Sequence, residues 1–137
     1  MRTNLRILKA ALAAIANLEA VRAVVSQADL TDYPEFAALM MTAGEGLDWK
    51  SYKVTSDDGY ITTLWRITGD NNVRTRDAPR GPVLLQHGIY SDGCGWLERS
   101  DASSAAFPTK LHHLGYDVWI ANNRGTTASQ GHTTLNW

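Results

Sequence analysis

A histidine and a glycine interrupt a short apolar run in the middle of the chain, and this pair carries the clearest chemical signal. The run Val83–Gln86 is typical of a buried strand, and His87 and Gly88 follow it directly. A buried strand that breaks into such a pair is typical of folds that deliver a backbone N–H to the mouth of an active site. The sequence therefore points to chemistry at the end of this strand.

A second apolar run lies about thirty residues further along. Asp117–Ala121 reads as another buried strand, which leaves through the polar loop Asn122–Gly125. The segment 103–114 between the two runs is expected to hold a helix, with Pro108 near its first turn and Gly115 at its end. Continuous apolar strands joined through a helix predict a parallel pair in a sheet covered on both faces.

The preceding segment has the shorter period of β-strands. Residues 49–67 form two β-rich runs joined by a tight turn at Ser56–Gly59, which predicts a hairpin. A short helix is expected at Phe36–Thr42, and 69–82 is expected to be an exposed connection. The fold class is α/β. With no strand assigned beside Val118 and Ile120, that edge of the sheet is predicted to be open and to need a partner.

The N-terminal segment 1–28 is expected to form a helix that is separate from the domain of residues 29–137. Apolar residues recur there at three- and four-residue spacing, and the first eighteen residues contain three basic side chains and no acidic one. A signal peptide, a mitochondrial presequence and a plain amphipathic helix all fit this pattern. No apolar run approaches the length of about 20 residues that a membrane span needs.

Composition limits the classes of protein. The chain has 137 residues, of which 44% are hydrophobic and 20% charged, and its net charge is −1. These values are ordinary for one globular domain, and they give no electrostatic basis for binding nucleic acid. The single cysteine, Cys94, excludes a disulfide within the chain.

Three further groups of residues invite a chemical interpretation. Ser129 precedes Gln-Gly, but no strand leads directly into it and Thr127 stands where a nucleophile elbow needs glycine, so we expect a loop serine. Cys94 could pair with His87 as a nucleophile, yet a small residue in a turn is the favoured interpretation. His112 and His113 are adjacent and would point about 100° apart on a helix, so no metal site is predicted.

Several motifs in one order and spacing link this chain to a known family. They are Asp58-Gly59-Tyr60-Ile61, Leu84-Leu85-Gln86-His87-Gly88, Trp96, Gly115-Tyr116-Asp117-Val118-Trp119, Asn123-Arg124-Gly125 and Gly131-His132-x-x-Leu135. With them the chain resembles the acid lipase family, which includes gastric and lysosomal lipases, over about residues 33–137. The resemblance implies the N-terminal part of an α/β-hydrolase fold.

The resemblance also implies a chemistry. Family members hydrolyse acylglycerols and sterol esters with a Ser-Asp-His triad. Of their functional residues only Ile89 maps here, and its backbone N–H would be one of two oxyanion-hole donors. His87 and Gly88 would then support the loop. The sequence departs from the family at Asn123, where serine is common, and at Tyr90, where a smaller aliphatic residue is common.

Catalysis needs parts that this sequence does not contain. A G-x-S-x-G elbow followed by an acid and a histidine is absent, so these 137 residues are expected to be inactive alone. The resemblance predicts a serine ester hydrolase of lipid metabolism that needs no cofactor and lies in a secreted or endolysosomal compartment, with a mitochondrial location as the alternative. Its expected partners are a lipid ester, a lipid surface touched transiently, and further hydrolase chain at the open strand edge. The competing hypothesis is a non-catalytic module that binds a partner through that edge.

Overall fold

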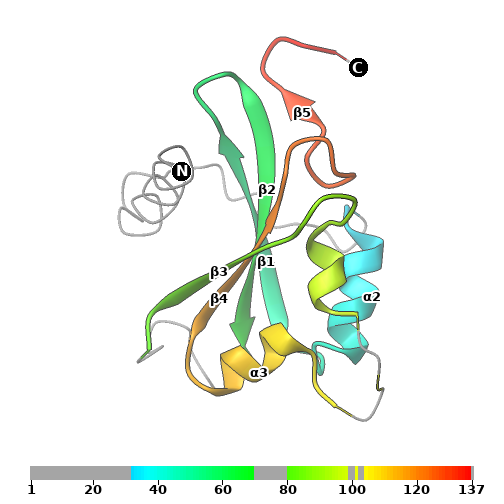
Figure 1. Cartoon of the computed structure of the whole chain (residues 1–137), viewed down its shortest axis with the longest axis vertical. Coiled ribbons are helices and arrows are strands. Elements are labelled where there is room, and N and C mark those ends of the chain that lie inside the picture. The colour runs from blue at the N-terminus through cyan, green and yellow to red at the C-terminus, as the bar shows by residue number, and fades with distance from the viewer. Residues whose placement is uncertain (1–31, 70–79, 99–100, 102–103, 137) are drawn as a thin grey trace.

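The computed structural model describes residues 32–69, 80–98, 101 and 104–136, so the helix expected within residues 1–28 lies outside the described part. The elements follow in the order α2 (Pro34–Thr42), β1 (Asp48–Thr55), β2 (Tyr60–Gly69), β3 (Pro82–Gln86), the 3-10 helix η2 (Gly93–Trp96), α3 (Phe107–His113), β4 (Asp117–Asn122) and β5 (Gly131–His132) (Figure 1). Helices and a mixed sheet together agree with an α/β fold.

The predicted hairpin is present. β1 and β2 pair antiparallel from Asp48 opposite Gly69 to Thr55 opposite Ile61. In the turn between them, the Gly59 N–H donates to the Ser56 carbonyl over 2.9 Å, and Gly59 has a φ of +89°. Only glycine adopts such a φ without steric cost, which explains why an Asp-Gly pair closes this hairpin.

The predicted parallel pair is also present. β3 and β4 run parallel, with Pro82 opposite Asp117 and Gln86 opposite Ala121. The helix between them, α3, begins only at Phe107, because Ala106 before it is in an extended conformation. Gly115 follows the helix with a φ of +88°, as expected for a glycine that ends a helix.

The prediction of an open edge beyond β4 is wrong. The sheet order is β1-β2-β4-β3, so β2 fills that edge by pairing antiparallel with β4, from Thr63 opposite Asn122 to Arg66 opposite Trp119. All six residues of β4 are buried, and a strand of this kind is stable only at the centre of a sheet. Among the described strands the outer positions fall to β1 and β3.

The main core lies on one face of the sheet. Alternate residues of β2, including Trp65 and Ile67, are buried under α2, η2 and α3, as the period of two in a strand requires. Phe36 of α2 stacks on Trp65 with 3.8 Å between ring centroids. The Thr109 hydroxyl of α3 donates to the Ala43 carbonyl over 3.0 Å, which joins the start of α3 to the end of α2.

On the face of the sheet opposite this core, β2 and β4 carry an ion pair. Arg66 donates two hydrogen bonds to the Asp117 carboxylate, over 2.7 and 3.0 Å, and the Trp119 indole N–H donates to the same carboxylate over 3.0 Å. The guanidinium also lies 4.9 Å from the Trp119 ring centroid. Burial would lower the pKa of Arg66, but the hydrogen bonds and charge of Asp117 outweigh it and raise this pKa. The pair therefore joins β2 to β4 as a charged, bidentate contact.

We expect Asp117→Asn to lower the free energy of unfolding by about 3 kcal/mol, because it leaves a largely buried guanidinium without its charge partner. Urea unfolding followed by tryptophan fluorescence measures this change. Glu45→Gln is the control, since it removes the exposed His113–Glu45 pair, whose atoms lie 2.8 Å apart. That control should change stability by less than about 1 kcal/mol. Equal effects of the two substitutions would contradict the role assigned to Asp117.

Candidate active site

The candidate site lies at the edge where the parallel strands end. Because Gln86 of β3 lies opposite Ala121 of β4, the next residues of both strands emerge side by side. His87 then enters one loop and Asn123 the other. Ligand sites in α/β sheets lie in this position, just outside the carboxyl ends of the strands.

The His87 ring joins the two loops. The backbone N–H of Asn123 donates to Nε2 of His87 over 3.0 Å, and Nδ1 lies 2.8 Å from the Gly88 carbonyl oxygen. A backbone N–H can only donate, so Nε2 must accept and the ring proton must sit on Nδ1, where it reaches the carbonyl. Both ring nitrogens of this buried histidine are therefore used by the backbone, and neither is available as a general base.

The far end of the loop after β3 is held by two side chains. Asp92 accepts a hydrogen bond from the Cys94 N–H over 2.8 Å and so caps η2. The Gly93 N–H donates to Oδ1 of Asn122 over 2.9 Å. A Cβ built on Gly93 would lie 2.7 Å from the Trp65 ring and 2.8 Å from the Ile120 side chain. Only glycine fits this close approach to the sheet.

Between these fixed ends the loop projects outward. Ile89 and Tyr90 have relative exposures of 88% and 101%. Tyr90 has a φ of +60°, a left-handed conformation that costs energy in a side chain of this size. The predicted donor, Ile89, thus directly precedes the loop residue that has a positive φ.

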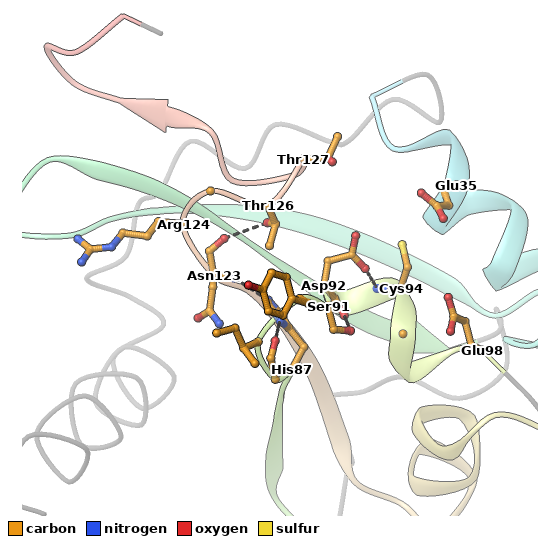
Figure 2. A pocket seen from close by; sticks show the side chains of 15 residues that line it. Glu35, His87, Ser91, Asp92, Cys94, Glu98, Asn123, Arg124, Thr126 and Thr127 are labelled. Atoms are coloured by element: carbon orange, nitrogen blue, oxygen red, sulfur yellow. Dashed lines mark hydrogen bonds between the residues drawn. The ribbon is translucent and has the colours of Figure 1, made fainter.

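Figure 2 shows the pocket that these loops enclose, an open cleft of about 700 Å³. Its walls come from the loop after β3, the loop after β4, η2 and α2. Acidic side chains, Glu35, Asp92 and Glu98, gather toward the η2 and α2 side, whereas Arg124 lies at the opposite side. Ile89 and the supporting residues His87 and Gly88 all line this cleft. These three residues are consecutive in the chain, and the fold places them beside residues 123–127 of the loop after β4.

Arg124 is held away from the cleft floor by contacts on its outer side. Its guanidinium donates to the Asp58 carboxylate over 2.9 Å and lies 4.7 Å from the Tyr60 ring centroid. A hydrogen bond from the Ser56 hydroxyl is the main cause that lowers the pKa of Asp58, and the charge of Arg124 adds to it. These contacts attach the loop after β4 to the hairpin turn.

Ser129 is a loop serine, as predicted. Its hydroxyl accepts from the Thr63 N–H over 2.8 Å and donates to the Asn122 carbonyl over 3.0 Å. With a relative exposure of 2%, it is out of reach of a substrate. Its hydroxyl therefore closes a buried hydrogen-bond network under the pocket and takes no part in chemistry.

Cys94 lies in the pocket wall with its thiol held neutral. Burial is the main cause that raises the pKa of Cys94 to about 12, and the negative charge of Asp92 is the second cause. Nucleophilic cysteines need a thiolate at neutral pH, and therefore a lowered pKa. The prediction of an inert residue in a turn agrees with this environment.

The remaining histidines serve local structure. His113 pairs with Glu45. Nδ1 of His132 accepts hydrogen bonds from the backbone N–H groups of Thr134 and Leu135, over 3.1 and 3.0 Å. Within the described ranges no group of three or more histidine, cysteine or acidic side chains could hold a metal ion. No helix in the same ranges is both long and apolar enough to cross a membrane.

Comparison with known proteins covers part of this site. The family model for the partial α/β-hydrolase lipase region matches residues 40–100, which include β1, β2, β3 and the His87–Asp92 loop. Over these residues the chain is therefore similar to that lipase region.

Individual relatives agree. Human lipase member K and human lipase member N are each 39% identical to this chain over 90 residues, or 66% of it. Human lysosomal acid lipase/cholesteryl ester hydrolase is 38% identical over 90 residues, again 66% of this chain. In all three cases the match covers 22% of the relative, so the chain spans about a fifth of the length of the relatives that it matches.

The structure brings together two residues that the sequence does not single out. The sequence places Asn122 at the start of the polar loop Asn122–Gly125, and it gives Gly93 no chemical role. The structure places Asn122 as the last residue of β4 and Gly93 as the first residue of η2, in contact with each other. An asparagine that directly follows the apolar run Val118–Ala121 is the signal that could draw attention to this position.

We expect Gly93→Ala to destabilise the fold by about 1–3 kcal/mol, because its new methyl group overlaps Trp65 and Ile120. Gly88→Ala is the matched control, since a Cβ there would meet no heavy atom within 4 Å. The control should stay within about 0.5 kcal/mol of the parent. Urea unfolding of the two variants side by side measures the difference, and equal stabilities would refute the close packing of Gly93.

We expect the Cys94 thiol to react with iodoacetamide at pH 7.5 roughly a thousandfold more slowly in the native chain than in urea, because its thiolate is so rarely formed. The raised pKa also sets the sign of a pH effect. The folded state favours the neutral thiol, so the free energy of unfolding should fall as the pH rises above about 8.5, the ordinary value. Equal alkylation rates in the native and unfolded chains would contradict the burial of this thiol.

Proposed function

We propose that this chain forms the N-terminal part of a serine ester hydrolase of lipid metabolism. The observation that carries the proposal is the loop after β3, which holds the Ile89 N–H at the carboxyl-end edge of the sheet between two fixed points, His87 and Gly93. Such an edge is where an acyl carbonyl would meet its oxyanion donors in an α/β-hydrolase.

The proposed chemistry assigns one step to this chain. When a serine attacks the ester carbonyl, negative charge develops on the carbonyl oxygen, and the Ile89 N–H would donate to that oxygen. A single preorganised donor contributes about 3 kcal/mol to lowering the barrier. The His87 ring would support this loop without exchanging a proton with substrate. The nucleophile, its acid and its histidine would be supplied by chain beyond these 137 residues, and no cofactor is needed.

The proposed substrates are acylglycerols or sterol esters, by analogy with relatives named lipase and cholesteryl ester hydrolase. Ile89 and Tyr90 supply exposed apolar surface beside the pocket, which suits a transient contact with a lipid surface. The name of the human lysosomal relative favours an endolysosomal or secreted location over the mitochondrial alternative.

The proposed partner strand belongs beside β3. Of the strands that are described, β4 alone pairs with β3. The other edge of β4, which the sequence predicts to be open, is occupied by β2. An outer parallel strand favours pairing with another strand, so we place further hydrolase chain there. The competing hypothesis, a non-catalytic module, differs in having an unrelated protein at the same edge.

The test is to capture the native polypeptide with an antibody against residues 48–69, and then to assay it on emulsified acylglycerol and on a cholesteryl ester. A fluorophosphonate probe tests for an activated serine in the same sample. We expect ester hydrolysis and a label on a serine within G-x-S-x-G. A captured chain of 15.1 kDa that neither hydrolyses ester nor reacts with the probe would favour the module.

The donor itself is tested in the active polypeptide by Ile89→Pro, which deletes the N–H. We expect kcat to fall by about 10²–10³. Ile89→Val keeps the N–H and is the matched control, expected within about threefold of the parent. Circular dichroism verifies that both variants fold. A folded Ile89→Pro variant with parental kcat would exclude Ile89 as a donor.

A further inference from the structure

The two ends of the loop after β3 are held by neighbouring residues at the end of β4. The Asn123 N–H donates to His87 where the loop begins, over 3.0 Å, and Asn122 Oδ1 accepts from the Gly93 N–H where it ends, over 2.9 Å. Ile89 lies between these points. The last residue of β4, Asn122, and the first residue of the loop after it, Asn123, therefore hold the two ends of the segment that lines the pocket.

The Asn122 side chain has no freedom to turn. It has a relative exposure of 2%, and its Nδ2 donates to the Thr63 carbonyl over 3.3 Å while Oδ1 accepts from Gly93. A flipped amide would set an N–H against the Gly93 N–H and an oxygen against the Thr63 carbonyl. Both buried groups would then lose their partners, which is costly. The amide is thus fixed by β2 on one side and holds the loop on the other.

Gly93 cannot slide along the sheet either. Its Cα faces the Trp65 ring and the Ile120 side chain so closely that an added Cβ would lie 2.7 and 2.8 Å from them. At the middle of the loop, Tyr90 has a φ of +60°. A strained residue of this kind keeps its conformation only when its surroundings determine it, and here the two held ends are those surroundings.

We propose that Asn122 is a positioning residue, which acts through Gly93 to set where the Ile89 N–H points. The Gly93–Asn122 contact fixes one end of the segment 88–92, and the His87–Asn123 contact fixes the other. Asn122 itself is buried beneath the pocket and touches no substrate. The inference rests on the proposed function in one respect, namely that the Ile89 N–H is the oxyanion donor.

The experiment is backbone ¹⁵N relaxation of the 137-residue chain and of its Asn122→Leu variant. Leucine has a similar volume but neither accepts from Gly93 nor donates to Thr63. We expect the order parameter of the Ile89 amide to fall from about 0.85, typical of rigid backbone, to below about 0.6. A folded variant in which the Ile89 amide keeps its parental order parameter would overturn the proposal.

Two further variants separate positioning from general loss of structure. Ser129→Ala removes a hydroxyl from the same buried network but leaves the Asn122–Gly93 contact in place, so the Ile89 order parameter should not change. Asn122→Asp keeps an acceptor for the Gly93 N–H, and we expect it to retain an order parameter closer to the parental one. An effect of Ser129→Ala as large as that of Asn122→Leu would also overturn the proposal.

If Asn122→Leu fails to fold, a measurement on the parent chain decides. Scalar coupling across the hydrogen bond from the Gly93 amide nitrogen to the side-chain carbonyl carbon of Asn122 should be detectable, and its absence in the folded chain would overturn the proposal. These readouts do not depend on catalysis. In the active polypeptide, Asn122→Leu should lower kcat more than it changes KM. A parental kcat in Ile89→Pro would contradict the proposed function of Ile89 but not the positioning of its loop by Asn122.

Discussion

Strand β4 is buried along its whole length, and the rest of the described structure depends on covering it. Each of its six residues is inaccessible, so both edges and both faces need partners. β2 covers one edge and β3 the other, while α2, η2 and α3 cover the face of Val118 and Ile120. The candidate site lies where β4 leaves the sheet, next to this buried strand.

Buried polar groups at the end of β4 restrict the site to one arrangement of its loops. Thr63, Asn122 and Ser129 are buried and form hydrogen bonds with one another, so the loss of one partner would leave another buried polar group unsatisfied. Such a network tolerates few alternative arrangements. The network therefore fixes the two loops relative to the sheet. The exposed Ile89 and Tyr90 can project into solvent while the ends of their loop stay in place.

Much of the local structure could be predicted from the sequence because its causes are local. Period-two runs around Asp57–Gly59 specify a hairpin, and continuous apolar runs specify β3 and β4. The pairing of β2 with β4 could not be predicted, since Thr63 and Asn122 lie 59 positions apart and no local pattern records which strands meet. This is also why the open edge was assigned to the wrong side of the sheet.

The candidate site also contains some residues that a local motif indicates and others that only the tertiary structure brings together. His87, Gly88 and Ile89 could be proposed from the sequence because a strand that ends in His-Gly is a local motif, which the resemblance to acid lipases links to an oxyanion hole. Asn122 and Gly93 could not, because their importance comes from an approach of two loops that only the tertiary structure creates. Burial of Cys94, which removes its reactivity, was consistent with the sequence but decided by the fold.

The central claim is that these residues supply the oxyanion side of a serine hydrolase whose nucleophile lies further along the same polypeptide. Sequencing the transcript across and beyond the codon for Trp137 tests it most directly. The account predicts an open frame that continues through a G-x-S-x-G elbow, followed by an aspartate and then a histidine. A stop codon immediately after Trp137 would contradict it, and would leave an acid lipase region without the chemistry proposed for it.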